Sequence, residues 1–178
     1  MTSAFPLALP SAVKPWHVAA AFGVLSLAIL VRRTREKRLV FSGPAEGYAA
    51  LESETGCDLR LLPGTVAFKN FVLESFGGYD AGILRECGGG LSGHYTGRSW
   101  DWGTDRNNAN VAGLFDLLFA RNDEVLRRAG ITYLIYNRRI WNTRARTWQN
   151  YTGADAHTTH VHFSFSTAGA NGQTSFYR

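Results

Sequence analysis

Three of the five histidines of this chain lie close together, within residues 157–162. They belong to the sequence Asp-Ala-His-Thr-Thr-His-Val-His, residues 155–162, which continues as Phe-Ser-Phe-Ser. Because successive side chains of a β-strand point to opposite faces, one face would carry His160, His162 and Ser164, and the other Val161, Phe163 and Phe165. The pattern predicts a strand that packs its apolar face on a core and uses its imidazoles for metal binding or catalysis. A strand with surface histidines is the alternative.

Residues 91–102 contain two further side chains that could bind a metal. His94 and Asp101 are seven residues apart, and Ser92 and Gly97 flank His94. Two imidazoles and a carboxylate suit Zn²⁺ and leave one coordination position open for water. We therefore expect zinc to be bound by His94, Asp101 and His162.

The pattern Ser-x-His-x-x-Gly-x-x-x-Asp, residues 92–101, followed by His-x-His on a strand, resembles the zinc D-Ala-D-Ala peptidases of the LAS group. That group includes D,D-carboxypeptidases, D-Ala-D-Ala dipeptidases and many phage endolysins. Residues 131–141, Ile-Thr-Tyr-Leu-Ile-Tyr-Asn-Arg-Arg-Ile-Trp, resemble the YIIWNxRIW segment of a secreted and phage-borne branch of that fold. The resemblance covers roughly residues 65–166, which is over half of the chain.

The resemblance implies a role for each matching residue. By position, His94, Asp101 and His162 match the zinc ligands of the family, and His160 matches a histidine that helps to stabilise the transition state. Arg85 resembles the arginine that binds the substrate carbonyl or the developing oxyanion. The implied substrate is a peptidoglycan peptide, cleaved at a bond that involves D-alanine.

The chain departs from the family at one catalytic position. The family usually places Asp or Glu three residues before the last zinc ligand, as the general base, and here that residue is Thr159, which is no base near neutral pH. Asp155 and His157 are the nearest replacements. The alternative function is a catalytically degenerate zinc domain that binds cell-wall peptide or has a structural role.

The positive net charge does not indicate a nucleic-acid-binding protein. The chain has a formal net charge of +5, but five of its basic residues and one acidic residue lie in residues 32–38. Residues 39–178 carry 13 Lys/Arg and 13 Asp/Glu, so this part is near neutral. It has no basic patch interleaved with stacking aromatic residues of the kind that binds nucleic acid.

Residues 15–31 contain no Lys, Arg, Asp or Glu, and the basic run follows them directly. A signal peptide has the opposite order of charge, so we expect a single-pass membrane anchor rather than a cleaved signal or a buried helix. The predicted organisation is a tail (residues 1–14), the anchor (15–31), a basic flank and linker (32–64) and the peptidase domain (65–178).

The positive-inside rule places the domain in the cytoplasm, whereas a peptidoglycan enzyme acts outside the cell. A viral membrane would remove this conflict. The oligomeric state is not indicated.

Apolar residues at mixed spacing, ended by two glycines, predict a helix over residues 65–76, and one apolar stripe predicts a helix over residues 110–120. A second short helix is expected over residues 123–129, ended by Gly130. Residues 131–136 and 161–166 are expected to be strands of one sheet, residues 142–159 a long loop over the cleft, and residues 167–178 a loosely held tail. The expected fold is α+β, with a small, mainly antiparallel sheet, helices on one face and the zinc in a cleft. Cys57 and Cys87 are the only cysteines, and they are either disulfide-bonded or two free thiols.

Overall fold

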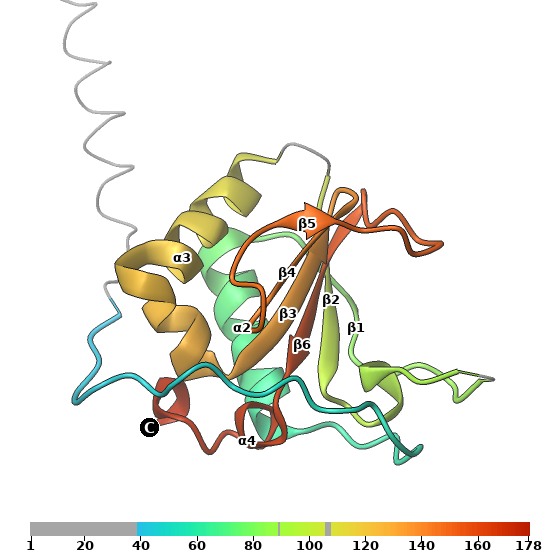
Figure 1. Ribbon diagram of the computed structural model, residues 1–178, viewed down its shortest axis with the longest axis horizontal. Helices are drawn as coiled ribbons and strands as arrows, with labels where there is room; N and C mark the ends of the chain where they lie inside the picture. Colours follow the sequence, from blue (N-terminus) through green and yellow to red (C-terminus); the bar gives the residue numbers. More distant parts are fainter. Residues whose placement is uncertain (1–38, 89, 106–107) are drawn as a thin grey trace, which may run out of the picture. The chain divides into compact units, whose positions relative to one another are not determined.

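The structure is a computed structural model that describes residues 39–178, apart from residue 89 and residues 106–107 (Figure 1). The expected anchor, residues 15–31, lies outside the described residues. No helix of the described part has both the length and the apolar composition needed to cross a bilayer. Leu39–Arg178 forms one compact unit, which begins well before the domain boundary expected at residue 65.

A six-stranded sheet forms the centre of this unit, with the strand order β1-β2-β6-β3-β4-β5. Every pair of neighbouring strands is antiparallel. The strands are β1 (Tyr79–Gly82), β2 (Ser99–Gly103), β3 (Ile131–Tyr136), β4 (Arg139–Asn142), β5 (Gln149–Asn150) and β6 (His160–Phe165). The strand that is last in the sequence, β6, therefore lies between β2 and β3, with a partner on both sides.

The helices pack on one face of this sheet, so the expected α+β class is confirmed (Figure 1). Helix α2 (Pro63–Phe76) begins with a proline, whose fixed φ suits the first helical turn, and ends at Gly77. Element α3 (Ala109–Ala129) contains non-helical residues at positions 120–123, so it corresponds to the two helices that we predicted. Three short helical segments complete the unit: η1 (Gly93–Tyr95), α4 (Thr167–Ala170) and η2 (Ser175–Tyr177).

The side chains of β6 alternate between the hydrophobic core and the polar face of the sheet, as predicted. Val161, Phe163 and Phe165 belong to the hydrophobic core. The ring of Phe68 in α2 is fully buried, and its centroid lies 5.3 Å from those of both Phe163 and Phe165. Strand β6 begins one residue earlier than we predicted, at His160. The helices thus cover one face of the strand, and the opposite face carries its polar side chains.

The prediction of a loosely held C-terminal tail is wrong. Residues 167–170 form α4, and Phe176 packs against Phe71 at a centroid distance of 5.3 Å. Gly169 is buried, and a Cβ there would lie 2.6 Å from the carbonyl oxygen of Ala129. The small residues of this segment therefore permit close packing, although their composition resembles that of a flexible tail.

Residues 39–62, called the N-terminal segment below, have no regular secondary structure but are bound to the domain by polar contacts. The side chain of Arg98 in the loop before β2 is buried, and it donates hydrogen bonds to Glu52 (2.7 Å) and Glu54 (2.6 Å). Glu46 accepts hydrogen bonds from the backbone N–H (2.6 Å) and the hydroxyl (2.7 Å) of Ser175. The segment that we expected to be a linker is thus part of the domain.

Candidate metal centre

The three expected metal ligands meet on the polar face of the sheet. Asp101 in β2 and His162 in β6 are directly opposite each other in the antiparallel register, and the side chains of such a pair share a face and lie close together. His94 comes from η1, just before β2. All three side chains are buried, and one ligand atom of each lies within 4.8 Å of the other two.

The glycine and serine of the sequence motif shape the turn that presents His94. The hydroxyl of Ser92 accepts a hydrogen bond from the backbone N–H of His94 (3.3 Å) at the start of η1. Gly97 ends this turn with a φ of +72°, and a Cβ there would overlap the carbonyl oxygen of Arg60. A residue with a side chain is disfavoured at such a φ, so the motif glycine has a structural role.

The distances between the ligand atoms fit a metal ion with four ligands. His94 Nε2 lies 3.3 Å from His162 Nδ1 and 3.4 Å from Asp101 Oδ2. His162 Nδ1 lies 2.8 Å from Asp101 Oδ1. Ligand atoms bound tetrahedrally with bonds of about 2.0–2.1 Å are about 3.3 Å apart. His94, Asp101 and His162 could therefore hold a metal ion with little rearrangement.

Hydrogen bonds and burial keep these ligands in the protonation states that metal binding requires. His94 Nδ1 donates to the carbonyl oxygen of Ile83 (2.7 Å), which leaves the Nε2 lone pair for a metal. Burial lowers the pKa of His162 to about 4, despite the neighbouring carboxylate, so this imidazole is neutral at pH 7. Burial raises the pKa of Asp101, but the hydrogen bond from His162 and the adjacent His94 ring outweigh it and hold that pKa well below its usual range.

Arg85 lies at the same carboxylate. Its Nη2 donates to Asp101 Oδ2, and its side chain is 54% exposed, whereas that of Asp101 is 1% exposed. The guanidinium thus reaches from solvent to the ligand cluster, and its exposure leaves it free to turn toward a molecule in the cleft.

A cleft of about 250 Å³ opens above the cluster. Arg85, His94 and His162 line it, together with Asp155 and His157. The last two come from residues 142–159, which we expected to cover the cleft. This segment contains β5 and also supplies the ring of Tyr151 to the cleft wall.

His160, the last of the residues predicted to act in catalysis, and its neighbour Thr159 lie beside the ligand cluster. His160 Nε2 is 3.9 Å from Asp101 Oδ1 and 3.8 Å from Asp155 Oδ2. Thr159 is exposed, and its hydroxyl lies 3.3 Å from His160 Nδ1. Asp155 and His157 fold back toward the cleft because the backbone N–H groups of residues 137 and 138 bond to the carbonyl oxygens of residues 157 and 156. The structure therefore brings all seven predicted site residues into one region.

Sequence reasoning missed the aromatic wall of the site. Tyr133 in β3 stacks on the ring of His162, with centroids 5.4 Å apart and an interplanar angle of 21°. Burial raises the pKa of Tyr133, so its hydroxyl remains protonated. The alternation of β3 could have placed Tyr133 on a face, but only the pairing of β3 with β6 shows that this face is the one that carries His162.

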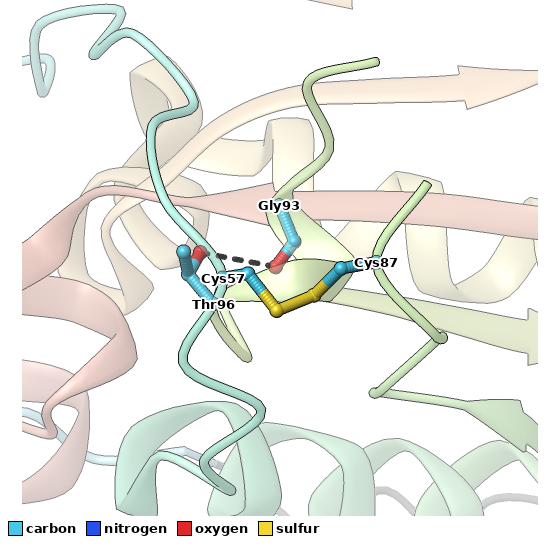
Figure 2. Close-up of a disulfide and its surroundings, with 4 residues drawn as sticks. All are labelled: Cys57, Cys87, Gly93 and Thr96. Carbon is cyan, nitrogen blue, oxygen red and sulfur yellow. Dashed lines mark hydrogen bonds between the residues drawn. A yellow bond between two sulfur atoms is a disulfide. The ribbon is translucent and has the colours of Figure 1, made fainter. Parts of the chain in front are cut away.

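A disulfide between Cys57 and Cys87 joins the N-terminal segment to the loop that follows Arg85 (Figure 2). This decides between the two states that the sequence left open. Close to the disulfide, the hydroxyl of Thr96 donates to the carbonyl oxygen of Gly93 (3.3 Å) within the turn of η1 (Figure 2). The cross-link thus fixes the loops on the side of the cleft that carries Arg85 and His94.

Residues 57–162 match the protein family described as VldE, C-terminal domain. The matched region contains every residue of the site described above, and the chain belongs to this family. No curated protein and no solved structure matches the chain.

Proposed function

We propose that this chain is a zinc-dependent peptidase that hydrolyses peptide bonds of peptidoglycan, in cell-wall lysis or remodelling. The observation that carries this proposal is the convergence of His94, Asp101 and His162, at the spacing of a tetrahedral site, below a cleft that is open to solvent. A neutral imidazole pair and one carboxylate form a donor set typical of zinc in hydrolases. The resemblance to the LAS peptidases is the basis for the substrate, a bond that involves D-alanine.

Bound zinc would polarise a scissile carbonyl and lower the pKa of a bound water to about 7. Arg85 would bind the substrate carbonyl and stabilise the negative charge that develops on it. It would leave Asp101 to do so, which its exposed side chain permits. His160, whose pKa burial lowers, is a neutral imidazole at the cleft edge and would donate its N–H to the same oxygen.

A group must also accept the proton of the attacking water. Thr159 cannot do this, and its hydroxyl is directed to His160 rather than to the cleft. Asp155 and His157 line the cleft, and the hydrogen bond from the backbone N–H of His157 keeps the pKa of Asp155 below its usual value. Asp155 is therefore ionised at neutral pH, and we assign the role of base to Asp155 or His157.

The domain would face an oxidising compartment, anchored by residues 15–31. The Cys57–Cys87 disulfide supports this location, because disulfides persist outside the reducing cytosol. It favours the outer side of a membrane over the side that the positive-inside rule indicates. Labelling of the chain in intact membranes with a cysteine-reactive reagent, before and after reduction, would test this location. We expect labelling only after reduction, and labelling without a reductant would show free thiols and contradict the proposal.

Hydrolysis is tested with the full-length, zinc-loaded chain on purified cross-linked peptidoglycan and on a stem pentapeptide ending in D-Ala-D-Ala. Mass spectrometry should detect released peptide or D-alanine, and His162→Ala should abolish the release. Asp58→Asn is the matched control, since Asp58 is an exposed carboxylate paired with Arg60 outside the cleft. Intact substrate after incubation with the zinc-loaded chain would refute the proposal.

The second candidate is a zinc domain that binds cell-wall peptide without cleaving it. It is favoured by Thr159, which removes the usual carboxylate from the site. In this case the pentapeptide should bind to the zinc-loaded chain and be recovered unchanged, and Arg85→Ala should weaken the binding. Turnover of the pentapeptide would exclude this candidate.

A further inference from the structure

A second group of potential ligands lies next to the first. One ligand atom from each of Asp155, His157 and His160 lies within 4.8 Å of the other two. Two of these residues belong to the segment before β6 and the third begins β6, so the turn at residues 155–159 brings them together. The resemblance to the LAS peptidases assigns these three residues to catalysis, and nothing in it predicts that they bind a metal.

His157 is held in the same way as the first-site ligand His94. Its Nδ1 donates to the carbonyl oxygen of Asp155 (2.8 Å), just as His94 Nδ1 donates to Ile83 (2.7 Å). Metal-binding histidines usually hydrogen-bond the other ring nitrogen in this way, because the bond fixes both the tautomer and the ring orientation. The contact leaves the Nε2 lone pair of His157 available for a metal.

The Nε2 atom of His160 also lacks a hydrogen-bond partner among the described residues. It is buried, and the residue as a whole is 9% exposed. A buried nitrogen without a partner is unfavourable. Two carboxylate oxygens face it beyond hydrogen-bonding distance, Asp155 Oδ2 at 3.8 Å and Asp101 Oδ1 at 3.9 Å. A nitrogen between two carboxylates at this spacing is suited to share a cation with them.

We propose that Asp155, His157 and His160 bind a second divalent cation of the Zn²⁺ class, adjacent to the first. Asp101 can contribute to both sites, because its Oδ1 is 2.8 Å from His162 Nδ1 and 3.9 Å from His160 Nε2. Hydrolases with two metals hold them about 3.5–4 Å apart and use the pair to activate water. With a second cation bound, Asp155, His157 and His160 would serve as its ligands in place of the base and oxyanion roles proposed above, and the metal pair would activate the water despite the absence of a carboxylate at Thr159.

The second site is looser than the first. Asp155 Oδ2 lies 3.8 Å from His160 Nε2, whereas in the first site His94 Nε2 lies 3.3 Å from His162 Nδ1 and 3.4 Å from Asp101 Oδ2. The side chain of Asp155 is also 59% exposed, whereas the first-site ligands are buried. Because the ligands must close around the ion, the second cation should bind after the first and more weakly.

The test is a zinc titration of the metal-free, full-length chain against a chromophoric chelator, with metal content measured by elemental analysis. We expect two zinc ions per chain, bound in two steps. His157→Ala and Asp155→Ala should each lose the weaker step alone, and His162→Ala should lose the tighter one. His17→Ala, which removes the histidine outside both groups, and Asp58→Asn should retain both.

Two results would overturn the proposal: a single zinc ion in the wild-type chain, or a second zinc ion that persists in both His157→Ala and Asp155→Ala. Cobalt gives a second measurement, because two adjacent Co²⁺ ions couple magnetically. The EPR intensity per cobalt should fall when the weaker step is filled in the wild-type chain, and not in His157→Ala. Neither measurement uses a substrate, so the second site can fail while hydrolysis is observed, and hydrolysis can fail while two ions bind.

Discussion

The stability of the metal-free chain should depend on pH through His162. Burial lowers the pKa of this imidazole to about 4 in the folded protein, whereas an unfolded chain titrates at about 6.5. Between these values the unfolded state binds the proton and the folded state does not. The free energy of unfolding therefore rises with pH in this window, and the contribution is complete above about pH 6.5 and lost as the pH falls toward 4.

The expected size follows from the difference between the two pKa values. A shift of one unit corresponds to about 1.4 kcal/mol, so protonation of His162 should cost about 2 kcal/mol at pH 5 and about 3 kcal/mol at pH 4, relative to pH 7. This is a large part of the roughly 5–15 kcal/mol that stabilises a typical domain. Zinc should oppose the loss, because it binds the neutral imidazole.

Urea denaturation of the chelator-treated, full-length chain at pH 7, 5 and 4 measures this effect. The matched control is His162→Gln, which retains a polar side chain beside Asp101 but cannot titrate. The wild-type chain should lose about 3 kcal/mol more than the variant between pH 7 and pH 4. Parallel losses in the two chains would show that His162 does not titrate at a lowered pKa and would refute the reasoning.

Three further changes have outcomes set by packing and chain connectivity. Phe68→Ala removes a fully buried ring from the core and should lower the free energy of unfolding by about 3–5 kcal/mol in urea, with zinc binding retained in the folded chain. Reduction of the Cys57–Cys87 disulfide, or Cys87→Ser, opens a cross-link between residues 30 positions apart and should cost about 3–4 kcal/mol in the same assay; an unchanged urea midpoint would contradict this. Gly97→Ala should lower the melting temperature and weaken zinc binding together, because a Cβ there overlaps Arg60 and displaces the turn that carries His94; Gly47→Ala, at an open position, should change neither.

Local patterns in the sequence were sufficient for the longer elements. The helices predicted over residues 65–76, 110–120 and 123–129 correspond to α2 and to the two parts of α3, and the strand predicted over residues 131–136 is β3. In each case a stripe or run of apolar residues faces the core, and a glycine follows the end of α2 and the end of α3. Periodicity and helix termination depend on near neighbours in the chain, so the sequence contains them directly.

Other elements exist only because of distant partners. All five residues of β2 are buried, and the strand lies inside the sheet through its pairing with β1 and β6. Strands β1, β4 and β5 have two to four residues each, and they are defined by pairing with their neighbours. The C-terminal segment has the composition of a flexible tail, but it packs against α2 and the end of α3. Such contacts are a property of the assembled fold.

The candidate site, too, was predictable from the sequence in part and was determined by tertiary structure in part. The residue types and their spacing predicted His94, Asp101 and His162 as a candidate ligand set, because imidazole and carboxylate chemistry belongs to the residues themselves. Tertiary structure decided that Asp101 and His162, separated by 61 positions, lie opposite each other with ligand atoms 2.8 Å apart. It also brought Asp155 and His157 back to the cleft and joined Cys57 to Cys87. Distances between residues far apart in the chain depend on strand register and on packing of the whole core, which no local pattern encodes.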